Sequence, residues 1–89
     1  MDASLHYNIW LYTNGYIKLR ALEDWYVPKL EELIDNPDTV YIIAQLELGL
    51  AELQDGLQTE EEFKSDLKVM IKKDLDEFFG KTYNMKLRK

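Results

Sequence analysis

The sequence contains no cysteine and only one histidine, His6. Without cysteine the chain forms no disulfide, no thiolate nucleophile and no cysteine-based zinc site, and one histidine does not complete a common zinc site. The acidic residues also lack the spacing of a calcium-binding loop. We therefore predict a non-enzymatic protein that has no catalytic residues and needs no metal or cofactor, with His6 at the surface or near a helix cap.

Long hydrophobic runs are also absent from the sequence. The longest uninterrupted apolar run covers only residues 40–44, whereas a membrane-spanning helix needs about 20 apolar residues. The N-terminus carries no basic segment followed by an apolar one, as a secretory signal would. Together with the lack of cysteine, these features predict a cytoplasmic protein that does not contact membranes.

Basic residues are scarce in the middle of the chain. Residues 21–62 contain 12 acidic residues and a single basic one, Lys29, although the whole chain has a net charge of only −6. This excess of negative charge produces an electrostatic field that repels nucleic acid and attracts basic proteins. We therefore expect a basic protein partner and no direct nucleic-acid binding. The alternative is that the acidic surface only keeps the protein soluble. The candidate partner-binding residues are Glu31, Glu32, Asp35, Asp38, Glu52, Asp55, Glu60 and Glu61.

The clearest predicted helix covers residues 60–79. Thr59 and Glu62 have the spacing of a capping box, apolar residues then recur at steps of three and four, and Gly80 is a typical helix-ending residue. Asp74 is the one acid on the apolar stripe: we expect it either at the edge of the core with a lysine or tyrosine partner, or at a hydrogen-bonded position of an interface. We predict one domain over residues 1–80 and a basic, frayed tail over residues 81–89.

A helix over residues 37–54 is predicted from Asn36 or Asp35 as its cap and Pro37 in its first turn. Its apolar residues fall on two opposite faces, which indicates a central helix or one that another subunit covers. The candidate residues for self-association on the second face are Tyr41, Ala44, Leu48 and Ala51.

The N-terminal third allows two interpretations. Helical spacing predicts helices over residues 4–13 and 19–34, the second disturbed at Pro28. The pair Asn14-Gly15 between aromatic and β-branched residues is, however, also typical of a β-hairpin, which would make the fold α+β. We favour a helix end at Gly15, because the sequence offers no convincing third strand.

Aromatic residues concentrate in this same N-terminal third. In so small a protein most of them must fill the core, although tryptophan and tyrosine are also typical of binding interfaces. We therefore expect the early aromatic residues to face inward and Tyr41 to be the exposed one. The early aromatic residues are Tyr7, Trp10, Tyr12, Tyr16, Trp25 and Tyr26.

Two stretches resemble a known pattern. Gly15–Trp25 reads G-x-I-x-L-x-x-L-E-x-W and Leu50–Phe63 reads L-x-E-x-x-x-G-x-x-T-E-x-E-F. Both are similar to small helical bacterial and phage proteins without assigned activity. The first more distantly resembles colicin-type immunity proteins, which are small acidic helical bundles that block a nuclease toxin by occupying its basic site. In those proteins a serine, threonine or aspartate usually caps the helix after the glycine, whereas this chain has Lys18.

The sequence therefore predicts an all-α protein, a small four-helix bundle. The function it favours is that of an acidic binding protein of the immunity or inhibitor type, which engages a basic partner such as a nucleic-acid-acting enzyme or toxin. The alternative is a structural or assembly protein that forms homodimers through the second apolar face of the helix over residues 37–54.

Overall fold

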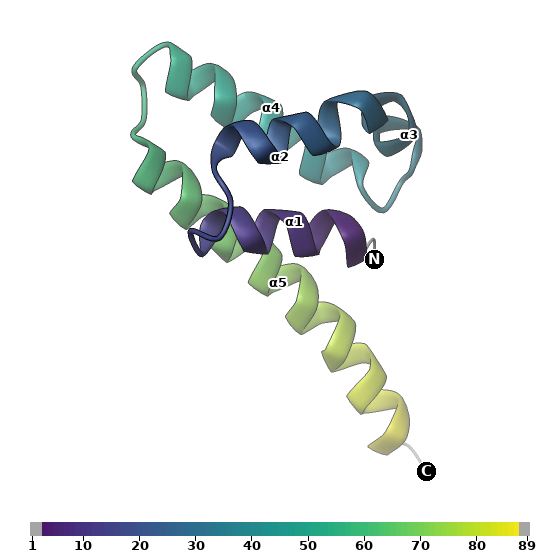
Figure 1. Ribbon diagram of the computed structural model, residues 1–89. Coiled ribbons are helices and arrows are strands. Elements are labelled where there is room, and N and C mark those ends of the chain that lie inside the picture. The colour runs from purple at the N-terminus through teal and green to yellow at the C-terminus, as the bar shows by residue number, and fades with distance from the viewer. Residues whose placement is uncertain (1–2, 88–89) are drawn as a thin grey trace.

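The computed structural model describes the backbone of residues 3–87 and the side chains of residues 4–76. These residues form helices and no strand, so the all-α prediction is confirmed and the hairpin alternative is wrong. Figure 1 shows α1 crossing α5; α2 packs against α1, and α3 packs against α4. The elements are α1 (Ala3–Thr13), α2 (Leu19–Tyr26), the 3₁₀ turn η1 (Val27–Lys29), α3 (Leu30–Asp35), α4 (Val40–Gln54) and α5 (Glu60–Leu87).

Helix α1 ends at Gly15, as predicted. Gly15 has a φ of +82°, which residues with a Cβ rarely adopt. Its N–H donates to the carbonyl of Tyr12 at 3.1 Å, and the N–H of Tyr16 donates to the carbonyl of Leu11 at 2.9 Å. This pair of bonds is the Schellman motif, and the turn after α4 at Gly56 repeats it.

The disturbance at Pro28 is also confirmed. The predicted helix over residues 19–34 consists of α2, η1 and α3 in succession, with Pro28 in the first positions of η1. Proline cannot donate the hydrogen bond that would continue α2, and its ring restricts the preceding turn, so the chain tightens into a 3₁₀ turn there. The side chain of Lys18 makes no cap hydrogen bond at the start of α2.

Helix α4 begins at Val40, three residues later than predicted. Asn36 does act as a cap, but of the turn over residues 37–39, where its Oδ1 accepts from the N–H of Asp38 at 2.9 Å. The buried hydroxyl of Thr39 donates to the carbonyl of Leu33 at 2.6 Å. This bond ties the turn to the end of α3, so the chain stays out of the helix until Val40.

Helix α5 begins as predicted but does not end at Gly80. The capping box is present: the N–H of Thr59 donates to Glu62 Oε1 at 3.1 Å, and the N–H of Glu62 donates to Thr59 Oγ1 at 3.2 Å. The helical backbone continues through Gly80 to Leu87. A glycine inside a helix costs only about 1 kcal/mol, and no proline follows to stop the helix. The side chains of the basic segment lie outside the described residues, and a frayed tail over residues 81–89 stays a prediction.

The core lies between α1 and α5 on one side and between α2, α3 and α4 on the other. Every helix contributes residues spaced three or four apart, so each presents one apolar stripe to the centre. Among the described residues the buried apolar side chains are Leu5, Ile9, Tyr12, Leu22, Tyr26, Leu33, Ile42, Ile43, Leu46, Phe63, Leu67 and Ile71.

The early aromatic residues do not all face inward, so that prediction is wrong in part. Tyr12 and Tyr26 are buried, but Tyr7, Trp10 and Tyr16 are exposed by 59%, 45% and 69%. Because Leu5, Ile9 and Tyr12 form the inward stripe of α1, residues 7 and 10 fall on its outer face. There the rings of Tyr7 and Tyr16 each stack on Trp10, which removes part of their apolar surface from water.

Candidate functional site

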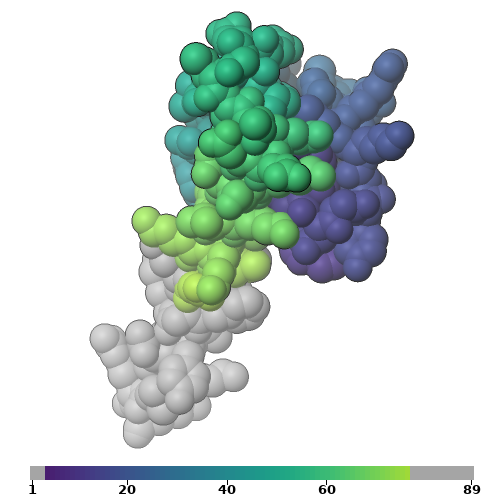
Figure 2. All heavy atoms as spheres, turned by 90° about the vertical axis from the view of Figure 1, so that its left-hand side faces the viewer, coloured from purple at the N-terminus to yellow at the C-terminus, as the bar shows by residue number. Residues whose placement is uncertain are grey.

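The eight acidic residues predicted to bind a partner divide into two groups. Glu31, Glu32 and Asp35 lie on α3 and Asp38 in the turn before α4, whereas the other four lie at the end of α4 and the start of α5. All are exposed except Glu52, which is half-buried. The groups lie at opposite ends of α4, whose 15 residues span about 22 Å (Figure 1). Figure 2 shows the second end, where the α4–α5 connection projects at the top of the molecule.

A second gathering of carboxylates surrounds two buried tyrosines. The hydroxyl of Tyr12 donates to Glu60 Oε2 at 2.8 Å, and the hydroxyl of Tyr26 donates to Glu47 Oε1 at 3.1 Å. Glu23 of α2 acts on both hydroxyls through its charge. We call Glu23, Glu47 and Glu60 the acidic patch. It joins three helices that are far apart in sequence, and it contains only one of the eight predicted residues.

The acidic patch is negative, and one cation lies beside it: the Nζ of Lys64 lies over the ring of Tyr12, 5.0 Å from its centroid. Burial, together with the hydrogen bond to Glu60 and its charge, raises the pKa of Tyr12 well above its ordinary value. Burial and then the charge and hydrogen bond of Glu47 raise the pKa of Tyr26 in the same way. Within residues 4–76 no carboxylate of the patch forms an ion pair with lysine or arginine.

Sequence reasoning missed Glu23 and Glu47, although one signal for them was present. A buried tyrosine needs an acceptor for its hydroxyl, and Tyr26 lies on the apolar stripe of its helix. The position of Tyr26 on the apolar stripe predicts that its hydroxyl needs a hydrogen-bond acceptor. It does not reveal which carboxylate of another helix meets the hydroxyl, because that depends on how α2 packs on α4.

The second apolar face of α4 is exposed, as predicted. Tyr41 and Leu48 are exposed by 43% and 54%, and Ala44 and Ala51 are also exposed. Next to this face lies a groove of about 550 Å³ between α4 and α5, which we call the α4–α5 groove. It is lined by Tyr41, Gln45, Asp66, Val69, Met70, Lys73 and Asp74.

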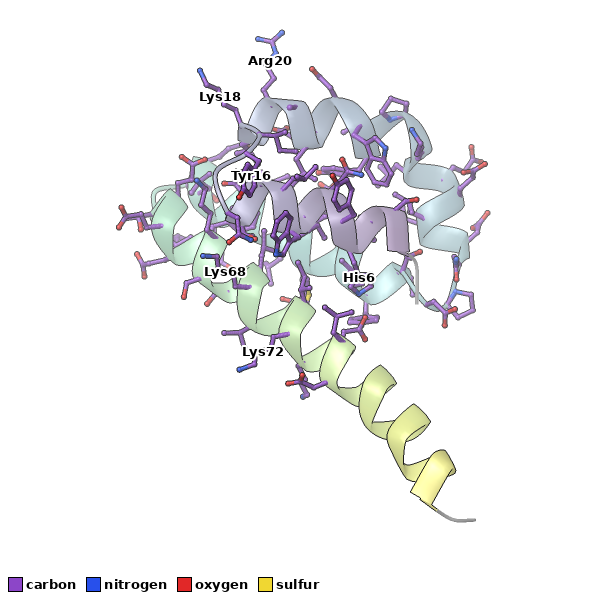
Figure 3. The ribbon with its side chains drawn as sticks, turned by 60° about the horizontal axis from the view of Figure 1, so that its bottom comes forward. His6, Tyr16, Lys18, Arg20, Lys68 and Lys72 are labelled. Atoms are coloured by element: carbon purple, nitrogen blue, oxygen red, sulfur yellow. The ribbon has the colours of Figure 1, made fainter. Side chains whose placement is uncertain are left out.

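His6 is buried, with 5% of its surface exposed, so the prediction of a surface or cap position is wrong. Its Nε2 pairs with Asp74 Oδ2, and the hydroxyl of Tyr41 donates to Asp74 Oδ1 at 2.5 Å. The predicted tyrosine partner of Asp74 is therefore confirmed. We call these three residues the His6 cluster; Figure 3 shows His6 on the side of α1 that faces α5.

The partners of Asp74 determine its charge state. Partial burial alone would raise the pKa of its carboxyl group. The hydrogen bonds from Tyr41 and His6 and the charge of His6 outweigh this effect, and the pKa is lowered below the ordinary value of 3.8. Asp74 therefore stays ionised at neutral pH. A single acid on an apolar stripe was the sequence signal for this cluster, whereas nothing in the sequence identified His6 as its partner.

A further groove, of about 450 Å³, lies between the end of α1 and the middle of α5. Its floor includes Trp10 and Ile71, and Lys68 and Lys72 line its rim. Figure 3 shows both lysines on the same side of α5. Asp76 also lines this groove.

Among the described residues no three His, Asp or Glu side chains lie close enough to hold a metal ion. In the same part of the chain no helix combines the length and apolar character that a membrane span needs. No family model, curated protein or solved structure matches this chain. Its function is therefore argued from the surfaces described above.

Proposed function

We propose that this chain is a non-enzymatic acidic binding protein of the immunity or inhibitor type, and that its partner is a basic protein such as a nucleic-acid-acting enzyme or toxin. The observation that carries this proposal is the acidic patch. Three helices hold Glu23, Glu47 and Glu60 around the hydroxyls of Tyr12 and Tyr26, with no basic side chain paired to them within residues 4–76.

The free protein has an unfavourable charge arrangement at this patch. Like charges that are fixed on packed helices repel one another, and the tyrosine hydroxyls neutralise none of that charge. Lysine and arginine side chains of a partner would supply the missing positive charge and would also accelerate the encounter. The acidic residues at both ends of α4 extend the same negative field beyond the patch.

The proposal is tested by capture of partners on the immobilised protein. We expect wild-type protein to retain a basic protein at 50 mM salt and to lose most of it at 0.5 M salt, because screening weakens exposed charge pairs. The variant Glu23→Gln/Glu47→Gln should bind about tenfold more weakly. The matched control Asp24→Asn/Asp76→Asn removes the same charge from exposed positions outside the patch.

An inhibitor should also change the activity of what it captures. A captured basic enzyme should therefore lose activity when wild-type protein is added, and should lose less with the double patch variant. Binding that ignores ionic strength, or a retained protein that is not basic, would contradict the proposal.

A second candidate function, self-association, is favoured by a separate observation. The apolar face of α4 remains exposed at Tyr41, Ala44, Leu48 and Ala51. A second copy that covers this face would remove it from water. Leu48→Glu should then lower the solution mass to that of a monomer, and a wild-type protein that is monomeric at high concentration would exclude this candidate.

A further inference from the structure

The outer edge of the α4–α5 groove carries a stripe that is complementary to itself. Asp66, Val69, Met70 and Lys73 follow one another along α5 and all line the groove. Val69 is exposed by 65%, which is high for a β-branched apolar residue, and Met70 is half-buried. The order along the helix is therefore one acid, two apolar residues and one base.

The spacing of the two charged residues matters. Asp66 and Lys73 are seven residues apart, so they lie on the same face of α5 and about 10.5 Å apart along its axis. The midpoint between them falls between Val69 and Met70. Both charged side chains are exposed, and neither forms an ion pair within residues 4–76.

We infer that the α4–α5 groove is the contact between two copies of this chain, related by a two-fold axis that passes α5 between Val69 and Met70. Around such an axis the two α5 helices run antiparallel, and Asp66 of each copy faces Lys73 of the other. At the centre, Val69 of each copy meets Met70 of the other. This inference rests on the second candidate function, self-association, and adds the surface and the register.

Charge complementarity favours a second copy over another occupant of the groove. A two-fold contact requires one patch to match itself, and a stripe with opposite charges at equal distances from its centre does so. Tyr41 and Leu48 of α4 flank the stripe and add apolar surface, which a stable interface needs beyond its ion pairs. An unrelated helical partner has no reason to require this symmetry.

Charge reversal tests the register. We expect wild-type protein to show a concentration-dependent dimer in sedimentation equilibrium. Asp66→Lys and Lys73→Asp should each weaken the dimer about tenfold or more, because each creates two like-charge contacts. The double variant Asp66→Lys/Lys73→Asp should recover the wild-type affinity, since its opposite charges face each other again. The matched controls Asp24→Lys and Lys68→Asp change the net charge equally and lie outside the stripe.

Cross-linking supplies a second measurement that does not depend on charge. Because the chain has no cysteine, a single Val69→Cys introduces the only thiol, and it lies next to the proposed axis. Mild oxidation should convert this variant to a covalent dimer. Lys68→Cys, which is exposed, lies about 100° around α5 from Val69 and lines the groove against α1, should remain monomeric under the same conditions.

Each outcome has a defined meaning. A wild-type protein that stays monomeric overturns both self-association and the proposed two-fold contact through α5. A dimer that dissociates with Leu48→Glu, but ignores the charge reversals or is not rescued by the double variant, keeps self-association and overturns the register. None of these results changes the salt-dependent binding of a basic partner, which tests the acidic patch separately.

Discussion

The His6 cluster and the acidic patch both join a carboxylate to a tyrosine hydroxyl, but only the His6 cluster adds a histidine to the carboxylate. Asp74 accepts from Tyr41 and pairs with His6, so its negative charge is stabilised inside the molecule and its pKa is lowered. Glu47 and Glu60 accept only from tyrosines, and their effect is to raise the pKa of those tyrosines.

The difference separates a structural role from the binding role proposed for the acidic patch. The carboxylate of the His6 cluster is satisfied by its own chain and has little to gain from a partner. In the acidic patch Glu47 and Glu60 are exposed, so an external cation can approach them. Four predictions test this distinction.

The largest effect is expected when the His6 cluster is broken. Asp74→Ala removes the carboxylate to which the buried His6 and Tyr41 are both hydrogen-bonded, and should lower the free energy of unfolding by about 2 kcal/mol. Urea denaturation measures the change. The control Asp76→Ala removes an exposed carboxylate of the same helix and should change stability by less than about 0.5 kcal/mol. Equal losses for the two variants would contradict a structural role for the cluster.

Loss of a tyrosine hydroxyl beside the acidic patch should have a smaller effect. Tyr26→Phe removes the hydrogen bond to the exposed Glu47 but keeps the buried ring, so we expect a loss of about 1 kcal/mol. Thermal or urea unfolding provides the measurement. The exposed Tyr7 is the matched site, and Tyr7→Phe should leave stability unchanged within error. A larger loss than that of Asp74→Ala would reverse the proposed order of the two clusters.

The free energy of unfolding should depend on pH in the acid range through Asp74 of the His6 cluster. The pKa of Asp74 is lower in the folded protein than the ordinary value of 3.8, so the unfolded chain binds its proton first as the pH falls. The contribution of Asp74 is therefore complete above that ordinary value and is lost as the pH falls through the folded pKa. Compared with the wild type, Asp74→Asn should flatten the acid limb of the curve of unfolding free energy against pH; an unchanged acid limb would exclude this assignment.

The smallest effect is expected at the acidic patch, and it has the opposite sign. Glu23→Gln removes one of three like charges and should stabilise the free protein by about 0.5 kcal/mol at low salt. The gain should disappear at 0.5 M salt, where the repulsion is already screened. If the variant is destabilised instead, repulsion among the three carboxylates does not dominate the patch.

Local signals in the sequence predicted the parts of the fold that depend on neighbouring residues. The capping box of Thr59 and Glu62 and the left-handed Gly15 act within one turn of chain, and the structure contains both. Pro37 predicted a helix start three residues too early. The hydroxyl of Thr39 donates to the carbonyl of Leu33 in α3, and this bond ties residues 37–39 into a turn. Gly80 wrongly predicted the end of the last helix. Glycine ends a helix only where the chain turns, and here the backbone stays helical to Leu87.

The candidate site was less predictable, because its groups meet only after folding. The exposure of Tyr41 and Leu48 followed from helical periodicity alone. The pair of His6 with Asp74 joins residues 68 positions apart, and Tyr26 with Glu47 joins different helices. Composition predicted an acidic molecule, but only packing decides which carboxylates share a surface. The three exposed rings of Tyr7, Trp10 and Tyr16 also stack only because α1 turns its opposite face to α5.

The packing of the first helix on the last has a consequence for synthesis of the protein. The inward stripe of α1 is made at the start of translation, but its partners Phe63, Leu67 and Ile71 follow about 50 residues later. At ordinary elongation rates this interval is roughly 3 to 10 seconds. During that time Leu5 and Ile9 lack their native cover on the ribosome, so a nascent chain that stalls before α5 is a natural target for chaperones and proteases.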